Sequence, residues 1–162
     1  MAADLYGLES RHRFLHICSP SFDPSVLEWV CTAFVGATLV VVPGEIIGGP
    51  ELAELLRTEA VTHTIITPAV LGTMDPAGLD ALEVLSVGGD VTTPELLAKW
   101  EPGRKYFNGY GPTETTIISS YAQLCTGGHV TIGKPVHGMA ALVLDARLRP
   151  VPPGVAGELY LA

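Results

Sequence analysis

The sequence predicts an α/β fold, a mostly parallel β-sheet flanked by helices and followed by a β-rich C-terminal portion. Up to about residue 126, short β-branched and apolar runs alternate with helical patterns, and only a few residues separate them. Such alternation is typical of parallel strands joined by helices. Beyond residue 126, glycine and proline become frequent and turns replace the helices between strands.

The elements can be placed in chain order. The first strand is expected at 14–17, and a helix follows at 24–35, with Asp23 as its N-cap and Pro24 at its first position. A β-branched run and an amphipathic pattern with leucines on one side then predict a strand and a helix. The remaining expected elements are strand 38–42, helix 50–60, strand 64–66, a short helix from Pro68, strand 82–87, a helix from Thr93-Pro94 to Trp100, and a strand at 106–107.

The C-terminal portion is read as a separate unit. Strands are expected at 140–144 and 158–161, with a turn at 150–154 between them. The chain is therefore divided into an α/β core subdomain, residues 1–126, and the start of a truncated β-rich subdomain, residues 127–162.

Composition narrows the possible functions. Hydrophobic residues make up 48% of the 162 residues and charged ones 16%, so part of the surface is expected to be covered by further protein. The net charge of −8 argues against a nucleic-acid partner, because neutralising phosphates requires clustered lysine and arginine. The chain has no apolar run of about 18 residues and no secretory pattern, so we expect no membrane association and a cytoplasmic location. Cys18, Cys31 and Cys125 are expected to be buried free thiols.

Three turns that follow expected strands carry the functional information. They are residues 19–23, 88–90 and 108–114, and the ends of parallel strands should bring them to one edge of the sheet. The segment 107–114 reads Phe-Asn-Gly-Tyr-Gly-Pro-Thr-Glu. An aromatic ring, a hydroxyl and a carboxylate on one turn suit a nucleotide, since they offer a stacking face, a phosphate donor and a metal ligand.

Taken together, these segments resemble the adenylation domains of nonribosomal peptide synthetases, within the adenylate-forming or AMP-binding superfamily. The match rests on ordered motifs at compatible spacing, which is more specific than any single motif. They are Ser-Phe-Asp-Pro-Ser-Val-Leu-Glu at 21–28, Ser-Val-Gly-Gly-Asp at 86–90, Asn-Gly-Tyr-Gly-Pro-Thr-Glu at 108–114, Ile-Gly-Lys-Pro at 132–135, and Gly-Glu-Leu-Tyr-Leu at 157–161.

The resemblance implies a binding site for the adenine of ATP or AMP. Tyr110 would stack on the ring, with the backbone of Gly88 and Gly89 on its other side. The amide of Asn108, helped by the Gly109 carbonyl, would read the adenine amino group. From the residues alone, an ordinary tight turn is the alternative.

The same motif implies two catalytic residues. Thr113 would donate to the α-phosphate of the nucleotide, and Glu114 would bind Mg²⁺, with phosphates and waters completing the metal shell. The alternatives are a helix N-cap for Thr113 and a solvated carboxylate in a first helical turn for Glu114.

The resemblance also implies an amino-acid pocket. Asp23 would neutralise the α-ammonium of the substrate, in addition to or instead of capping the helix. The other implied pocket positions are apolar or small, so an apolar or weakly polar substrate side chain is expected; they are Pro24, Leu27, Ile65, Ser86, Gly88, Gly109, Ile117 and Ile118.

The implied activity is the ATP-dependent activation of an amino acid as an aminoacyl-adenylate, a ligase reaction of secondary-metabolite biosynthesis. The product would be loaded onto the phosphopantetheine of a carrier protein, and carrier and condensation domains of the same synthetase are the implied partners. The family's phosphate loop, ribose-binding Asp motif and catalytic Lys are not in this sequence, so the chain alone is expected to be inactive. The alternatives are an acyl- or aryl-acid ligase of the same superfamily and a non-catalytic binding module that retains the fold.

Overall fold

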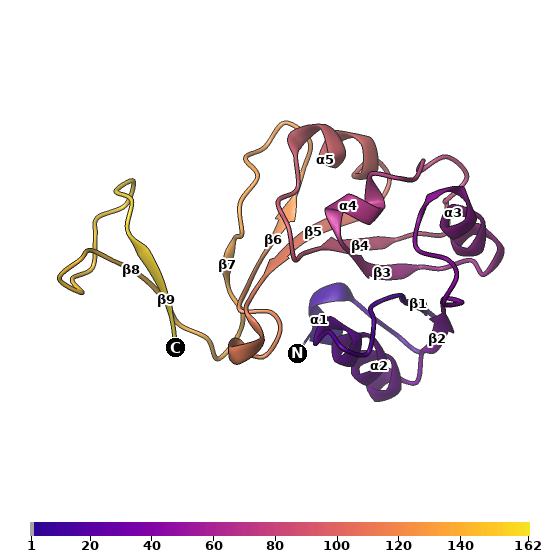
Figure 1. The fold of residues 1–162 in the computed structure, drawn as a ribbon, viewed down its shortest axis with the longest axis horizontal. Coiled ribbons are helices and arrows are strands. Elements are labelled where there is room, and N and C mark those ends of the chain that lie inside the picture. The colour runs from indigo at the N-terminus through magenta and orange to yellow at the C-terminus, as the bar shows by residue number, and fades with distance from the viewer. Residues whose placement is uncertain (1) are drawn as a thin grey trace.

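The computed structural model describes residues 2–162 and contains a seven-stranded sheet with helices on both faces (Figure 1). A two-stranded sheet follows at the C-terminal end of the chain. The predicted fold class, an α/β sheet flanked by helices with a β-rich C-terminal portion, is confirmed.

The large sheet has the strand order β2-β1-β3-β4-β5-β6-β7. Neighbouring strands from β2 to β5 pair in parallel, whereas β6 and β7 join in antiparallel orientation. The carboxyl ends of β1, β3, β4 and β5 therefore lie along one edge. The strands are β1 (Arg13–His16), β2 (Thr38–Val41), β3 (His63–Ile66), β4 (Val84–Val87), β5 (Lys105–Tyr110), β6 (Ser120–Leu124) and β7 (Lys134–Pro135).

The helices form two layers around this sheet. In Figure 1, α1 and α2 lie on one side of it and α3, α4 and α5 on the other. Proline stands at the first or second position of α2 to α5, where its missing N–H removes no helical hydrogen bond. The helices are α1 (Ala2–Tyr6), α2 (Pro24–Val35), α3 (Gly49–Thr58), α4 (Pro68–Leu71), α5 (Pro94–Trp100) and the 3₁₀ turn η1 (Thr113–Thr115).

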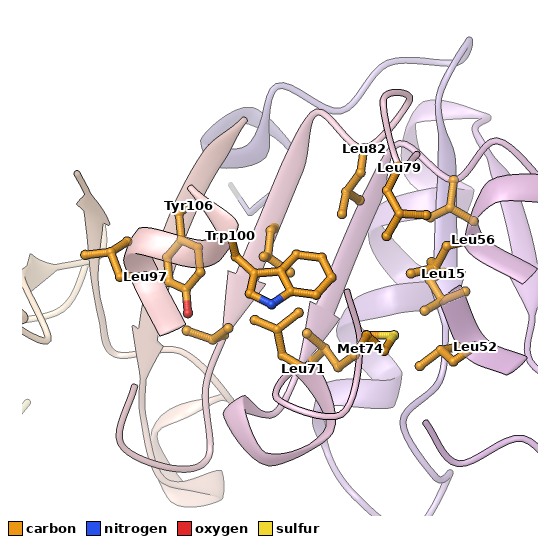
Figure 2. Close-up of a cluster of buried hydrophobic side chains, with 14 of the residues drawn as sticks. Leu15, Leu52, Leu56, Leu71, Met74, Leu79, Leu82, Leu97, Trp100 and Tyr106 are labelled. Carbon is orange, nitrogen blue, oxygen red and sulfur yellow. The ribbon is translucent and has the colours of Figure 1, made fainter. Parts of the chain in front are cut away.

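Strand residues alternate between two buried cores. Leu15, Leu85 and Tyr106 face the larger core, while Phe14 and Val84 face the smaller one beneath α1 and α2. Figure 2 shows the larger core, in which the ring of Trp100 lies at the centre of a group of leucines from α3, α4 and the strands. Burial of the parallel strands on both faces explains their nearly continuous apolar sequences.

Several elements differ from the sequence-based expectations. The strand expected at 106–107 is longer, because β5 continues through Asn108 and Gly109 to Tyr110, and the turn begins only at Gly111. Helix α1 and strand β6 were not expected; α1 is too short to show a helical period.

The cysteines differ partly from expectation. Cys18, Cys31 and Cys125 are all free thiols, as expected. Burial was expected for each of them, but only Cys31 is buried, Cys18 is half-buried and Cys125 is exposed.

The C-terminal strands β8 (Ala141–Leu144) and β9 (Glu158–Leu161) form an antiparallel pair that projects from the main body in Figure 1. The strand that precedes this pair along the chain, β7, is the last strand of the large sheet and pairs with β6. Among residues 2–162, no helix combines the length and apolarity needed to cross a lipid bilayer.

Helix α2 has an unusual distribution of polarity. Its only charged residue, Glu28, is buried, and large apolar side chains cover its outer surface. We call this surface the α2 apolar face; it consists of Val26, Trp29, Val30 and Phe34. A contiguous apolar face of this kind is typical of a surface that another protein segment covers.

We expect the isolated chain to associate with itself through the α2 apolar face. Replacing Trp29 and Phe34 by Gln should raise the apparent dissociation constant about tenfold or more, because burying one large apolar side chain contributes roughly 1.5–3 kcal/mol. Light scattering coupled to size-exclusion chromatography measures the change. Val91, an exposed apolar residue between β4 and α5 and outside α2, provides the control as Val91→Gln, which should leave association unchanged. A wild-type chain that stays monomeric over the same concentration range would contradict this expectation.

Candidate amino-acid and nucleotide site

A cavity of about 490 Å³ lies at the carboxyl edge of the large sheet. Its walls come from the loop after β1, the start of α2, the ends of β3, β4 and β5, and the loop between β5 and β6. The structure brings together in this lining all nine residues expected in the amino-acid pocket, which are Asp23, Pro24, Leu27, Ile65, Ser86, Gly88, Gly109, Ile117 and Ile118.

Asp23 is the only charged residue in the cavity lining. The expected N-cap interaction is wrong: Asp23 directly precedes α2, but its carboxylate accepts no hydrogen bond from the helix. Its backbone has helical dihedral angles, and its backbone carbonyl accepts from the amide of Val26 at 3.0 Å. A capping residue needs extended backbone geometry to turn its side chain toward the helix. The half-buried Asp23 carboxylate is therefore free to meet a cationic group in the cavity.

The loop that carries Asp23 is anchored by a buried carboxylate to which the sequence analysis assigned no role. Glu28, fully buried in α2, pairs with His16 and accepts from the backbone amide of Cys18 at 3.2 Å. Burial raises the pKa of Glu28, an effect that hydrogen bonds from Cys18 and His16 partly offset. Burial, followed by the charge of Glu28, raises the pKa of the Cys18 thiol. The signal in the sequence was a single charge in an otherwise uncharged helix.

The loop between β5 and β6 folds back tightly to form another wall. A Cβ at Gly111 would lie 2.6 Å from both the Ile117 carbonyl oxygen and the Ser119 nitrogen, so only glycine fits there. Ile117 has φ +74°, an unfavourable conformation for a β-branched residue. The amide of Ser119 donates to the Tyr110 carbonyl at 2.8 Å, which closes the loop. Strained loops of this kind occur at ligand sites where the surrounding structure holds them.

The residues expected to bind the nucleotide lie next to the cavity. Gly88 and Gly89 are part of the lining, but Asn108, Tyr110, Thr113 and Glu114 are not. Tyr110 ends β5 and is partly exposed, between the lining residues Gly109 and Gly111. The residues expected to bind the nucleotide thus lie at the same edge of the sheet as Asp23. The cavity itself remains available for a second group, the substrate.

The side chains expected to contact the nucleotide differ in exposure. Asn108 is buried, and its amide nitrogen donates to the Thr131 carbonyl at 2.9 Å, which leaves the amide oxygen as the acceptor. Thr113 and Glu114 are exposed in η1. Within residues 2–162 no group of three or more His, Cys, Asp or Glu side chains could hold a metal ion. A Mg²⁺ ion that keeps phosphates and waters as ligands needs only one or two protein carboxylates, and Glu114 fits that requirement.

Helix α1 packs against strands β3, β4 and β5, whose ends line the cavity. The sequence did not predict this contribution. Tyr6 is buried, and its ring packs edge-to-face on Phe107 at 5.6 Å between ring centroids. Its backbone carbonyl accepts from Nε2 of the buried His63 at 3.2 Å, which fixes α1 to β3. Burial lowers the pKa of His63 to about 4, so the ring is neutral at pH 7.

The fold and this cavity define a class, an α/β domain with a ligand site where the carboxyl ends of its strands meet. The chain belongs to the AMP-binding enzyme family, whose model matches residues 1–162. The resemblance to the adenylation domains of nonribosomal peptide synthetases is confirmed by curated relatives and by a solved structure.

Two curated relatives are synthetases. The chain is 43% identical over 160 residues to CymA of Salinispora arenicola (strain CNS-205), described as a probable nonribosomal peptide synthetase, and covers 97% of its own length but 2% of the relative. It is 42% identical over 161 residues to a linear gramicidin synthase of Brevibacillus parabrevis, with 98% of the chain and 3% of the relative covered.

The fold also matches a solved structure. The N-terminal subdomain of Klebsiella oxytoca NpsA in complex with 3-hydroxyanthranilyl-AMSN superposes with a TM-score of 0.84 and 27% identity. The match covers 98% of this chain and 42% of that subdomain. The chain therefore spans a small part of the curated synthetases and less than half of a solved subdomain.

We expect acid to weaken the fold through His63. Its folded-state pKa of about 4 lies below the unfolded value of about 6.5, so the unfolded state binds more protons between these pH values. Stability should therefore fall by about 3 kcal/mol between pH 7 and pH 4 because of this group. Urea unfolding at both pH values, with His63→Gln, measures the effect.

The matched control for this titration is His129→Gln, because His129 is exposed. It should retain the full pH dependence of the wild type, whereas His63→Gln should flatten it. The ring of His12 lies 4.5 Å from that of His63, so His12→Gln separates its contribution. Equal pH dependence in wild type and His63→Gln would contradict the assignment.

Proposed function

We propose that the chain is the substrate- and adenine-binding part of an adenylation domain, which activates an amino acid with ATP as an aminoacyl-adenylate. The observation that carries the proposal is the carboxylate of Asp23, which has no ion-pair partner among residues 2–162 and makes no capping hydrogen bond, in a mostly apolar cavity. An isolated charge is costly in such a place unless a ligand of opposite charge completes it. The α-ammonium of an amino acid is such a ligand.

The amino-acid half of the proposed site has two functions. Asp23 would hold the α-ammonium by a charge-assisted hydrogen bond, which orients the substrate carboxylate toward the nucleotide. The rest of the lining would accommodate the substrate side chain. Leu27, Ile65, Ile117 and Ile118 supply apolar surface, which favours an apolar or weakly polar amino acid.

The nucleotide half lies at the end of β5. Tyr110 would stack on adenine, with the Gly88-Gly89 backbone opposite, and the free amide oxygen of Asn108 would accept from the adenine amino group. The Gly109 carbonyl would assist Asn108. The backbone after β4 lies close to that of β5, since a Cβ at Gly88 would lie 3.0 Å from the Gly109 carbonyl oxygen. This close approach supports a nucleotide site at these two glycines.

Two residues of η1 would act on the phosphates. Thr113 would donate its hydroxyl proton in a hydrogen bond to the α-phosphate, where negative charge builds as the substrate carboxylate attacks and pyrophosphate leaves. Glu114 would hold Mg²⁺, which supplies neutralising charge to the phosphates when bound. The Glu114 carboxylate is in no ion pair among residues 2–162.

Further protein would complete the reaction. The lysine that the family uses in catalysis is not among these 162 residues, so the chain alone is expected to be inactive. In the synthetase, the product would be transferred to the phosphopantetheine of a carrier domain and then to a condensation domain. The relatedness to synthetases supports these partners and a cytoplasmic location.

A second candidate function is favoured by one observation. The NpsA subdomain that matches this fold was solved with a 3-hydroxyanthranilyl compound, so an aryl-acid ligase of the same family is the alternative. Asp23 discriminates between the two, because an acid without an α-amino group has no ammonium for this carboxylate to neutralise. A binding module without catalysis would keep the cavity but need neither Thr113 nor Glu114.

We expect Asp23→Ala, made in the synthetase that contains this chain, to lower amino-acid-dependent ATP–pyrophosphate exchange about a hundredfold or more. Truncating one member of a buried charge pair costs roughly 2–5 kcal/mol. Asp80→Ala, which removes an exposed carboxylate outside the cavity lining, is the control. Two results together would establish the alternative function. The wild type would show no exchange with any amino acid, and Asp23→Ala would keep full exchange with an aryl acid.

We expect Glu114→Gln in the same synthetase to raise the Mg²⁺ concentration for half-maximal exchange about tenfold, because a neutral amide is a weaker ligand for a hard cation than a carboxylate. A Mg²⁺ titration at saturating ATP and amino acid measures this shift. Glu45→Gln, at an exposed carboxylate outside the site, should leave the titration unchanged. An unaltered Mg²⁺ requirement in Glu114→Gln would remove Glu114 from the metal site.

A further inference from the structure

A pair of buried hydroxyl groups lies at the base of the cavity. The phenol oxygen of Tyr6, from α1, is 3.2 Å from the hydroxyl oxygen of Ser86, from β4. Both residues are only 2% exposed. Ser86 lines the cavity, whereas Tyr6 lies behind it and outside every sequence motif that suggested the function.

Counting protons assigns the direction of this hydrogen bond. The two hydroxyls carry two protons, and one of them lies in the bond between the oxygens. If Ser86 donated, the proton of Tyr6 would be buried without an acceptor, since Ser86 is the only hydrogen-bond partner of the phenol among residues 2–162. A buried unsatisfied donor costs roughly 1–3 kcal/mol. Tyr6 therefore donates and Ser86 accepts.

Tyr6 carries its proton at neutral pH, as tyrosine ordinarily does, and burial raises its pKa further, to about 12. Two contacts hold Tyr6 in place. The backbone carbonyl of Tyr6 is held by His63, and its ring is held against Phe107. The phenol is thus a fixed donor beneath the cavity.

The remaining proton belongs to Ser86 and has one direction in which to find an acceptor. The hydroxyl has no hydrogen-bond partner besides Tyr6 within residues 2–162. Strand β4, which carries Ser86, is paired in parallel with β3 on one side and β5 on the other. Its neighbours in register on these two strands, Ile65 and Phe107, have apolar side chains. The proton therefore points toward the cavity, where water or a bound ligand can accept it.

We propose that Tyr6 is a specificity-positioning residue, which orients the Ser86 hydroxyl as a donor toward the substrate side chain. The preferred amino acid then has a neutral, mostly apolar side chain that bears an acceptor oxygen, in a hydroxyl, ether or carbonyl group, at the depth of Ser86. This inference rests on the proposed function of the cavity as an amino-acid site. It deepens that proposal by naming the chemistry that the base of the cavity recognises.

The test compares amino acids that differ only by an oxygen in place of a methyl or methylene group. Suitable pairs are threonine and valine, O-methylserine and norvaline, and O-methylhomoserine and norleucine. Amino-acid-dependent ATP–pyrophosphate exchange by the synthetase gives kcat/KM for each. In at least one pair, we expect the wild type to favour the oxygen-containing member about tenfold, the typical value of one neutral hydrogen bond.

Two variants remove the Ser86 hydroxyl and the Tyr6 phenol hydroxyl separately. Ser86→Ala should abolish the preference, because the donor is gone. Tyr6→Phe should reduce it several-fold with little change in kcat/KM for the carbon member, because the Ser86 proton is then no longer directed into the cavity. A preference that survives both substitutions would overturn the proposal.

Tyr106→Phe is the matched control. Tyr106 makes the same kind of buried pair, its phenol 2.7 Å from the Thr92 hydroxyl, but faces the larger core away from the cavity lining. It should lose stability comparable to that of Tyr6→Phe, as thermal unfolding measures, and keep the wild-type preference. A loss of preference in Tyr106→Phe would mean that destabilisation alone changes selectivity and would overturn the assignment to Tyr6.

The outcomes for the two proposals are distinguishable. Exchange that proceeds with both members of every pair at equal kcat/KM would overturn the role of Tyr6 and Ser86 and leave the adenylation function intact. The absence of exchange with every amino acid would overturn the adenylation function, and this inference with it.

Discussion

The site depends on one constraint, the parallel pairing of β1, β3, β4 and β5 with both faces buried. In a parallel sheet every chain reversal passes through a helix or a long loop, so the carboxyl ends of the strands share one edge. The loops after β1, β4 and β5 therefore meet although more than 60 residues separate the first from the last. No local interaction among these loops is required to bring them together.

Helix α2 connects the core to the site. Its inner surface places Glu28 against His16 and thereby holds the loop of Asp23, while its first turn contributes Pro24 and Leu27 to the cavity. Its outer surface is the α2 apolar face, which has no partner among residues 2–162. A helix with its charge inside and its apolar residues outside is typical of a segment whose outer surface is covered by further protein. The 42% coverage of the NpsA subdomain agrees with this interpretation.

Much of the site was predictable because its residues lie in short motifs with characteristic spacing. The helix starts at Pro24 and Pro94 were correct to the residue, because proline restricts the backbone to a conformation that suits a first helical turn. The extent of β5 was not predictable, since glycine and asparagine usually end strands, and pairing with β4 and β6 overrides that preference at Asn108 and Gly109. The cap at Asp23 failed for a similar reason, because the loop anchored by Glu28 sets its backbone angles.

The sequence by itself determined the fold class, the family, the order of most strands and helices, and nine of the residues that line the cavity. These features depend on patterns along the chain, such as the alternation of strand and helix and the motifs at the strand ends. Only the tertiary structure decided that Asp23 has a free carboxylate, that Glu28 is buried against His16, and that Tyr6 reaches Ser86 across 80 positions. The reason is physical: whether a polar group is satisfied depends on partners from distant segments, and no pattern within one segment records them.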